Sequence, residues 1–141
     1  MAYKGSIEAT TPPVKWPFRE GGLVPKVLCA CQDATYCDKL LVSFEPHTEF
    51  QLCLTAIEGF AMVEEAIEVD PALVLLEVEA DSENLALAEA FKLLIPQLPI
   101  FLIAERTWEF EKAALSIGVD AVFGKDEDFG LVIENVKAAI T

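Results

Sequence analysis

Five short apolar runs alternate along the chain with longer stretches that have the period of an amphipathic helix. The runs are Val27–Cys31, Phe50–Ala56, Leu73–Val78, Ile100–Ala104 and Ala121–Phe123. Runs that are apolar on successive residues are typical of strands with both faces covered. The apolar stripes of the second and third helical stretches are Phe60, Val63 and Ile67, and Leu87, Phe91, Leu94 and Ile95. The alternation predicts a three-layer α/β domain, in which helices cover both faces of a doubly wound parallel sheet of five strands.

Residues 1–25 have no helical or strand period, and they contain four prolines and three glycines. Proline restricts its own backbone and biases the preceding residue toward extended conformations. We therefore expect an N-terminal arm at residues 1–25, followed by one domain at residues 26–141. Trp16 and Phe18 are large side chains for a solvated tail. The sequence leaves open whether they dock on the domain, dock on a partner or pack loosely.

The chain is strongly acidic, with 24 acidic residues against ten basic ones and a formal net charge of −14 at pH 7. A surface this negative repels phosphate backbones and anionic lipid head groups, so we expect neither nucleic acid nor a bare membrane as a partner. No apolar run approaches the ~20 residues that a membrane span needs. In a signal peptide an apolar stretch follows the first basic residues, but no such stretch follows Lys4. These features favour a cytoplasmic protein.

The cysteines do not point to a metal centre. Cys29, Cys31, Cys37 and Cys53 fit no common zinc-binding spacing, and the one histidine is His47. In a cytoplasmic protein a disulfide framework is not expected, and free cysteines behave as small apolar side chains. We predict four free thiols and no bound metal.

Polar residues at the carboxyl ends of the strands are the candidates for a functional site, because ligands of doubly wound sheets bind there. Asp33 follows the first run, Glu77 lies near the end of the third, and Lys125 follows the fifth. We expect these two carboxylates and the lysine to converge. The chain contains no GxGxxG, GxxxxGKS, GxxxxGKT or GxSxG motif. The sequence therefore argues against dinucleotide binding, P-loop chemistry and a hydrolase nucleophile elbow.

Four segments, taken with the order of the elements, resemble the receiver domain of bacterial response regulators. They are Lys26–Gln32, Pro71–Val78, Pro99–Ala104 and Gly118–Lys125. The resemblance covers residues 26–141 and implies a flavodoxin-like (βα)5 fold with strand order 2-1-3-4-5. It also implies a role in two-component signalling, where a histidine kinase is the partner that supplies a phosphoryl group.

The resemblance places unusual residues at the family's acidic positions. Glu77 stands where the family has its phosphoacceptor aspartate, and Cys31 and Gln32 stand where two acidic residues help to hold Mg²⁺. Asp33 lies one residue after the two positions of that pair. A thiol and a neutral amide cannot replace two hard anionic ligands for Mg²⁺. We therefore expect no cofactor and no metal at this site.

The remaining site positions lack the groups that couple phosphorylation to a change of shape. Ala104 stands at the position of the family's Thr or Ser, and Val122 at its aromatic switch residue; Lys125 alone matches. We predict a degenerate receiver, or pseudo-receiver, that is not an enzyme and acts through protein–protein interaction. Glu77 is then expected to pair with Lys125 instead of accepting a phosphoryl group. The other interpretation is that the charge of Glu77 mimics the phosphorylated state, and the missing switch residues favour the pair.

Two other functions stay open at this point. One is a working receiver that accepts a phosphoryl group, with Mg²⁺, at Glu77 or a nearby aspartate. Asp81 is the nearest, although its position before the third helix favours a helix N-terminal role. The other is a binding site for a small ligand that uses Cys31 and the vacated acidic pocket.

The expected partner surface is formed by the fourth helix, the fifth strand and the fifth helix, which receivers use for output or dimerisation. In this chain it would include Arg106, Trp108 and Lys112, with Trp108 as the candidate anchor because exposed aromatic residues anchor interfaces. The same face is the expected contact of a homodimer.

Overall fold

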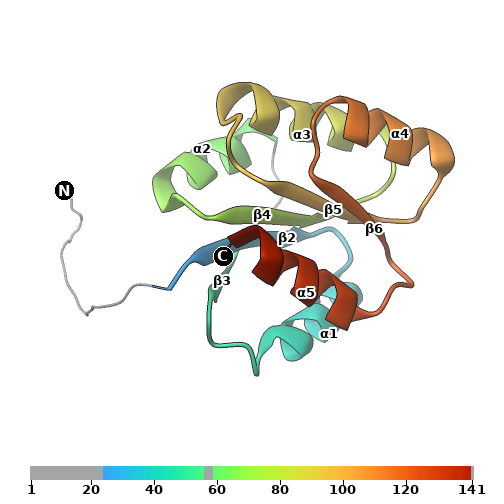
Figure 1. The fold of residues 1–141 in the computed structure, drawn as a ribbon. Helices are drawn as coiled ribbons and strands as arrows, with labels where there is room; N and C mark the ends of the chain where they lie inside the picture. Colours follow the sequence, from blue (N-terminus) through green and yellow to red (C-terminus); the bar gives the residue numbers. More distant parts are fainter. Residues whose placement is uncertain (1–23, 56–58, 141) are drawn as a thin grey trace.

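The computed structural model describes residues 24–55 and 59–140, which form alternating strands and helices (Figure 1). In chain order the elements are β2 (Lys26–Cys31), α1 (Ala34–Phe44), β3 (Gln51–Leu54), α2 (Phe60–Val69), β4 (Leu73–Glu77), α3 (Ser82–Leu94), β5 (Ile100–Ala104), α4 (Trp108–Ser116), β6 (Ala121–Gly124) and α5 (Phe129–Ile140). Each of the five predicted apolar runs overlaps a strand, and β2 and β6 each extend one residue beyond the predicted run. Residues 1–23, which hold most of the predicted arm with Trp16 and Phe18, lie outside the described residues.

The five strands form one parallel sheet in the order β3-β2-β4-β5-β6. Counted along the chain from Lys26, this is the predicted order 2-1-3-4-5. Because the strands are parallel, their carboxyl ends share one edge of the sheet. The register places Glu77 opposite Cys31 on one side and opposite Ile103 on the other.

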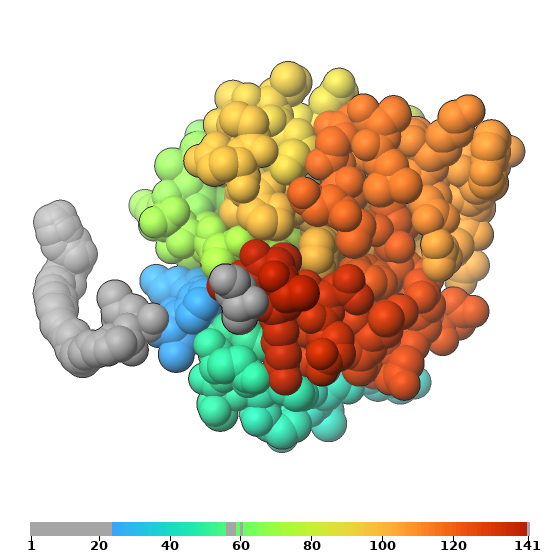
Figure 2. Space-filling view, in the orientation of Figure 1, coloured from blue at the N-terminus to red at the C-terminus, as the bar shows by residue number. Residues whose placement is uncertain are grey.

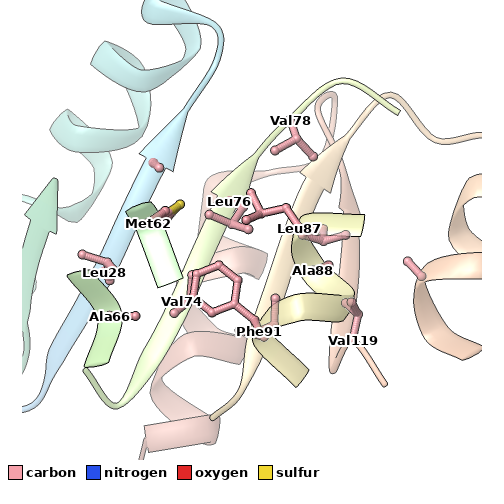
Figure 3. Close-up of a cluster of buried hydrophobic side chains, with 14 of the residues drawn as sticks. Leu28, Met62, Ala66, Val74, Leu76, Val78, Leu87, Ala88, Phe91 and Val119 are labelled. Carbon is pink, nitrogen blue, oxygen red and sulfur yellow. The ribbon is translucent and has the colours of Figure 1, made fainter. Parts of the chain in front are cut away.

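Helices cover both faces of the sheet, as predicted, and the two layers have different members. Helices α2, α3 and α4 pack on one face, and α1 and α5 pack on the other (Figures 1 and 2). Strand β4 is buried along its whole length. Its Val74 and Leu76 belong to the first layer, where Phe91 of α3 lies beside Val74 (Figure 3), and its Leu73 and Leu75 belong to the second.

The buried faces of α2 and α3 differ from the predicted stripes. Ile67 and Leu94 were expected in the core, but they are 61% and 57% exposed. On α2 the predicted Val63 is buried, and Met62 and Ala66 join it in the core in place of Ile67. Met62 and Ala66 are four residues apart and lie on the same side of α2, so this side faces the sheet. Ile67 lies outside this buried side of the helix. Leu94 ends α3, where the chain turns toward β5.

Polar residues mark the ends of two of the helices. Asp81 caps the N-terminus of α3 by accepting a hydrogen bond from the Asn84 N–H at 2.9 Å, so the predicted helix N-terminal role is confirmed. Asp70 ends α2 in the left-handed conformation, with a φ of 55°.

No helix in the described part of the chain is long and apolar enough to cross a membrane. All four cysteines are free.

Candidate functional site

Asp33, Glu77 and Lys125 meet at the carboxyl edge of the sheet. The Lys125 Nζ lies 2.9 Å from Asp33 Oδ2 and 3.1 Å from Glu77 Oε2. The three residues come from the end of β4 and from the segments that follow β2 and β6. The convergence expected from the sequence is therefore present, and it takes the form of one ammonium group shared by two carboxylates.

Glu77 is the buried member of this group, with a side chain that is only 3% exposed. Its Oε1 accepts hydrogen bonds from the backbone N–H of Gln32 at 2.9 Å and of Asp33 at 2.8 Å. Its Oε2 contacts Lys125. Both oxygens are thus engaged, which satisfies the requirement that a buried charge be paired and hydrogen-bonded.

Asp33 has two roles at once. Its Oδ1 accepts from the Tyr36 N–H at 3.2 Å and caps α1, while its Oδ2 accepts from Lys125. The Lys125 hydrogen bond, followed by the cap, holds the pKa of the Asp33 carboxyl below its ordinary value. The capping role could have been read from the sequence, since Asp is a preferred residue immediately before a helix.

Lys125 is held from several sides. Its hydrogen bond to Asp33 is the largest cause that raises the pKa of the ammonium group, and the bond to Glu77 adds to it. The Nζ also lies 5.5 Å from the centroid of the Tyr36 ring, within cation–π range. The Tyr36 ring packs on Phe129 of α5, and burial raises the pKa of its hydroxyl to about 12. This aromatic support was not predicted from the sequence.

The positions that the resemblance gives to acidic residues are filled by Cys31 and Gln32. The Gln32 Oε1 accepts from the backbone N–H of Glu79 at 2.8 Å, so the side chain joins the loop after β2 to the loop after β4. It also lies 3.4 Å from the side-chain amide of Asn84, which is itself buried. A hydrogen bond with Cys29, and then burial, raise the pKa of the Cys31 thiol. Asn84 was missed because nothing in its sequence position signals a contact with Gln32.

On the other side of Lys125, ionic contacts tie together the loops after β5 and β6. The Arg106 guanidinium contacts Glu111 at 2.7 Å and Glu127 at 3.1 Å. Glu127 also accepts from the N–H of Gly124 at 2.6 Å. A side chain on Gly124 would meet an Arg106 carbon at 2.9 Å, so Arg106 lies directly over this backbone. These contacts therefore connect the two loops.

The predicted switch and surface residues are divided between core and solvent. Ala104 and Val122 are both buried, and Val122 packs in the cluster beneath α3 and α4. Trp108, at the start of α4, is 71% exposed. The Lys112 Nζ lies 4.8 Å above its ring. The expected anchor is thus a solvent-exposed indole, whereas the two positions linked to switching are apolar core.

The residues at this edge do not fit a Mg²⁺ ion. Mg²⁺ requires near-octahedral oxygen coordination. Here Lys125 engages both carboxylates, two N–H groups hold the remaining oxygen of Glu77, and Cys31 contributes sulfur. Among the described residues, no group of three or more His, Cys, Asp or Glu side chains is placed to hold a metal ion. The positive charge that these carboxylates require comes from the chain itself.

Taken together, the five parallel strands in this order and the two helical layers make the flavodoxin-like α/β fold of response-regulator receiver domains. Comparison with solved structures supports this class. A DNA-binding response regulator of the LuxR family from Staphylococcus aureus is 13% identical, with a TM-score of 0.72 over 84% of this chain and 100% of the other. A protein described as the signal receiver domain of the response regulator NarL from Mycobacterium tuberculosis is 16% identical, with a TM-score of 0.72 over 84% and 98%.

A third similar structure is described as a pilus assembly protein, CpaE, from Burkholderia thailandensis. It is 20% identical, with a TM-score of 0.68 over 83% of this chain and 98% of the other. No family model and no curated protein matches the sequence. At these identities the likeness establishes the receiver fold, and the function has to be argued from the site.

Proposed function

We propose that the domain is a receiver-like signalling module that acts by protein–protein interaction and does not accept a phosphoryl group at Glu77. The observation that carries this proposal is the Lys125 ammonium shared by Asp33 and Glu77. In phosphoryl transfer to a carboxylate, one of its oxygens must attack phosphorus while cations neutralise the phosphoryl oxygens. At Glu77 both oxygens are engaged and the side chain is buried, so attack on phosphorus would require the carboxylate to give up these contacts and become exposed.

The positions around Lys125 also support a domain without a phosphorylation switch. Ala104 offers no hydroxyl that could follow a phosphoryl group, and Val122 is a small buried side chain instead of an aromatic residue that could reorient. A switch needs an element with two arrangements whose balance the modification changes. The ionic contacts of Arg106 connect the adjacent loops in the arrangement described here.

The surface that would bind the partner is then present without activation. Trp108 and Lys112 lie exposed on α4, beside the loops that Arg106 joins. An exposed tryptophan on a rigid helix can bury a large area at small entropic cost, which is typical of interface anchors. We propose this part of α4, next to β6 and α5, as the contact for a protein partner or for a second copy.

Acetyl phosphate with Mg²⁺, followed by intact-mass measurement, tests the first part of the proposal. We expect no gain of a phosphoryl group in the wild-type protein. Two matched variants, Glu77→Gln and Asp33→Asn, identify the acceptor if a gain is seen. A gain that Glu77→Gln abolishes would show a working phosphoacceptor at Glu77. This result contradicts the proposal for Glu77. A gain that only Asp33→Asn abolishes would place the acceptor at the more exposed aspartate, and it would contradict the proposal that the domain acts without phosphorylation.

The surface is tested separately by affinity capture from the native cell with the wild type, with Trp108→Ala and with Val42→Ala. Val42 is a suitable control because it is 66% exposed and lies on α1, in the opposite helical layer. We expect a specific protein that binds the wild type and Val42→Ala but not Trp108→Ala. Equal capture by both variants would show that α4 does not form the contact.

A further inference from the structure

An open groove lies between the ends of α2 and α3, away from the site at the carboxyl edge. It has a volume of about 460 Å³, and its lining includes Ile67, Leu94, Leu98 and Pro99. The helical period had placed both Ile67 and Leu94 in the core, but both are more than half exposed. In Figures 1 and 2, α2 (green) and α3 (yellow) run side by side over this face. The groove therefore combines exposed apolar side chains with polar groups such as Asp70 and Gln97, and nothing in the described residues covers it.

The mouth of this groove is negative. Asp70 lines it and ends α2, whose last turn contains no basic residue. The C-terminus of a helix carries partial negative charge, which adds to that of Asp70. Asp70 makes no ion pair within residues 24–55 and 59–140. The nearby Lys92 is bound to Asp120 and to the carbonyl of Leu98. A ligand for this groove should be apolar and cationic.

One segment of the chain has this chemistry. Residues 15–19 read Lys-Trp-Pro-Phe-Arg, so two aromatic side chains are flanked by two positive charges. Residues 1–23 hold three of the ten basic residues but only two of the 24 acidic ones, whereas the rest of the chain carries the acidic excess. Charge complementarity therefore favours contact between this segment and the body of the domain.

The point of attachment lies close to the groove. The N–H of Ala72, which lines the groove, donates to the carbonyl of Lys26 at 2.8 Å. Figure 1 shows the start of β2 at the same edge of the sheet as the connection from α2 to β4. Arg19 precedes Lys26 by seven residues, and an extended chain of that length spans roughly 23 Å. The segment can thus reach the groove from its own domain.

We propose that residues 15–19 of this chain dock in the groove between α2 and α3, with the Trp16 ring against Ile67 and Leu94 and a basic neighbour near Asp70. A second groove, lined by Val24, Leu41 and Phe44, is the alternative place for this segment. Its Phe44 and Phe50 are already buried, and of the two acids beside it Glu49 is paired with Lys137, whereas Glu45 has no ion pair in the described residues. The inference does not depend on whether Glu77 accepts a phosphoryl group.

Acrylamide quenching of Trp16 fluorescence tests the proposal. The chain has two tryptophans, so Trp108→Phe leaves Trp16 as the only reporter. In that background we expect quenching of Trp16 about two- to threefold weaker than in the urea-unfolded chain, as for a buried aromatic anchor. Ile67→Ser and Leu94→Ser should restore strong quenching, because each removes apolar surface against which Trp16 is proposed to dock. Both side chains are exposed, so their loss leaves the fold intact. Asp70→Asn, which suits the left-handed backbone, should weaken the protection.

The matched controls are Val42→Ser, an equally exposed apolar residue on α1, and Glu45→Gln, an acid that lines the second groove. Neither should change the quenching, and circular dichroism verifies that each variant is folded. Trp16 that is quenched as strongly as in the unfolded chain would overturn the proposal. So would protection that Ile67→Ser and Leu94→Ser leave unchanged. Protection that falls on dilution would assign the groove to a second copy of the chain instead, because docking within one molecule is independent of concentration.

Discussion

Replacement of Lys125 by methionine removes the cation that two carboxylates share. The variant keeps an unbranched side chain one atom shorter than lysine, but it leaves Glu77, whose side chain is 3% exposed, without an opposite charge. Removal of one partner from a buried ion pair is destabilising because the remaining charge stays buried and uncompensated. We therefore expect Lys125→Met to lower the free energy of unfolding at neutral pH.

The size of the effect follows from the contacts that remain. Loss of one partner from a fully buried pair costs about 3–5 kcal/mol. The Lys125 side chain is 25% exposed, so water can partly replace it. Glu77 also keeps the N–H donors of Gln32 and Asp33, which continue to stabilise its charge. These two features reduce the expected loss to about 2 kcal/mol.

Urea denaturation followed by circular dichroism measures this loss, and Lys39→Met on α1 is the control. Lys39 is exposed and has no ion pair in the described residues, so its replacement should change the free energy of unfolding by less than about 0.5 kcal/mol. Adding Glu77→Gln to Lys125→Met should recover part of the stability, because the buried charge is then gone. A Lys125→Met variant as stable as Lys39→Met would refute the reasoning.

Two further predictions concern the same site and the core. The lowered pKa of Asp33 means that its contribution to stability is present at neutral pH and is lost as the pH falls below its ordinary value near 3.8. Asp33→Asn should therefore flatten the dependence of the urea midpoint on pH in the acidic range, and a variant that keeps the wild-type acid dependence would contradict this assignment. Phe91 is fully buried beside Val74 (Figure 3), so Phe91→Ala should cost about 3–5 kcal/mol in urea denaturation. A loss below about 1 kcal/mol would mean that the cluster around Phe91 is not closely packed.

The sheet could be predicted from the sequence because its strands are buried on both faces. Leu73–Glu77 and Ile100–Ala104 have no exposed residue, so their apolar runs are continuous and their ends are marked by the first polar residue. The meeting of Asp33, Glu77 and Lys125 could be predicted for a related reason. In a parallel sheet the carboxyl ends share one edge, so topology alone brings these residues together.

The details that depend on the rotation of a side chain or a helix could not be predicted. Whether Ile67 or Ala66 contacts the sheet depends on a turn of α2 about its axis, and the helical period of the sequence allows both. The contact of Gln32 with Asn84 joins residues from two loops, and no pattern in either loop signals it. The sequence likewise gave no sign that the Tyr36 ring supports Lys125.

An internal cation has a consequence for how binding to this domain would be controlled. A ligand or modification can shift a domain only between arrangements that it binds or stabilises unequally. At the carboxyl edge Lys125 joins Asp33 and Glu77, and next to it Arg106 connects the loops after β5 and β6. A partner that binds the exposed face of α4 would meet a preorganised surface, which lowers the ordering cost of association. Under the proposed function, binding of the partner would therefore follow the amounts of the two proteins and not the phosphorylation state of Glu77.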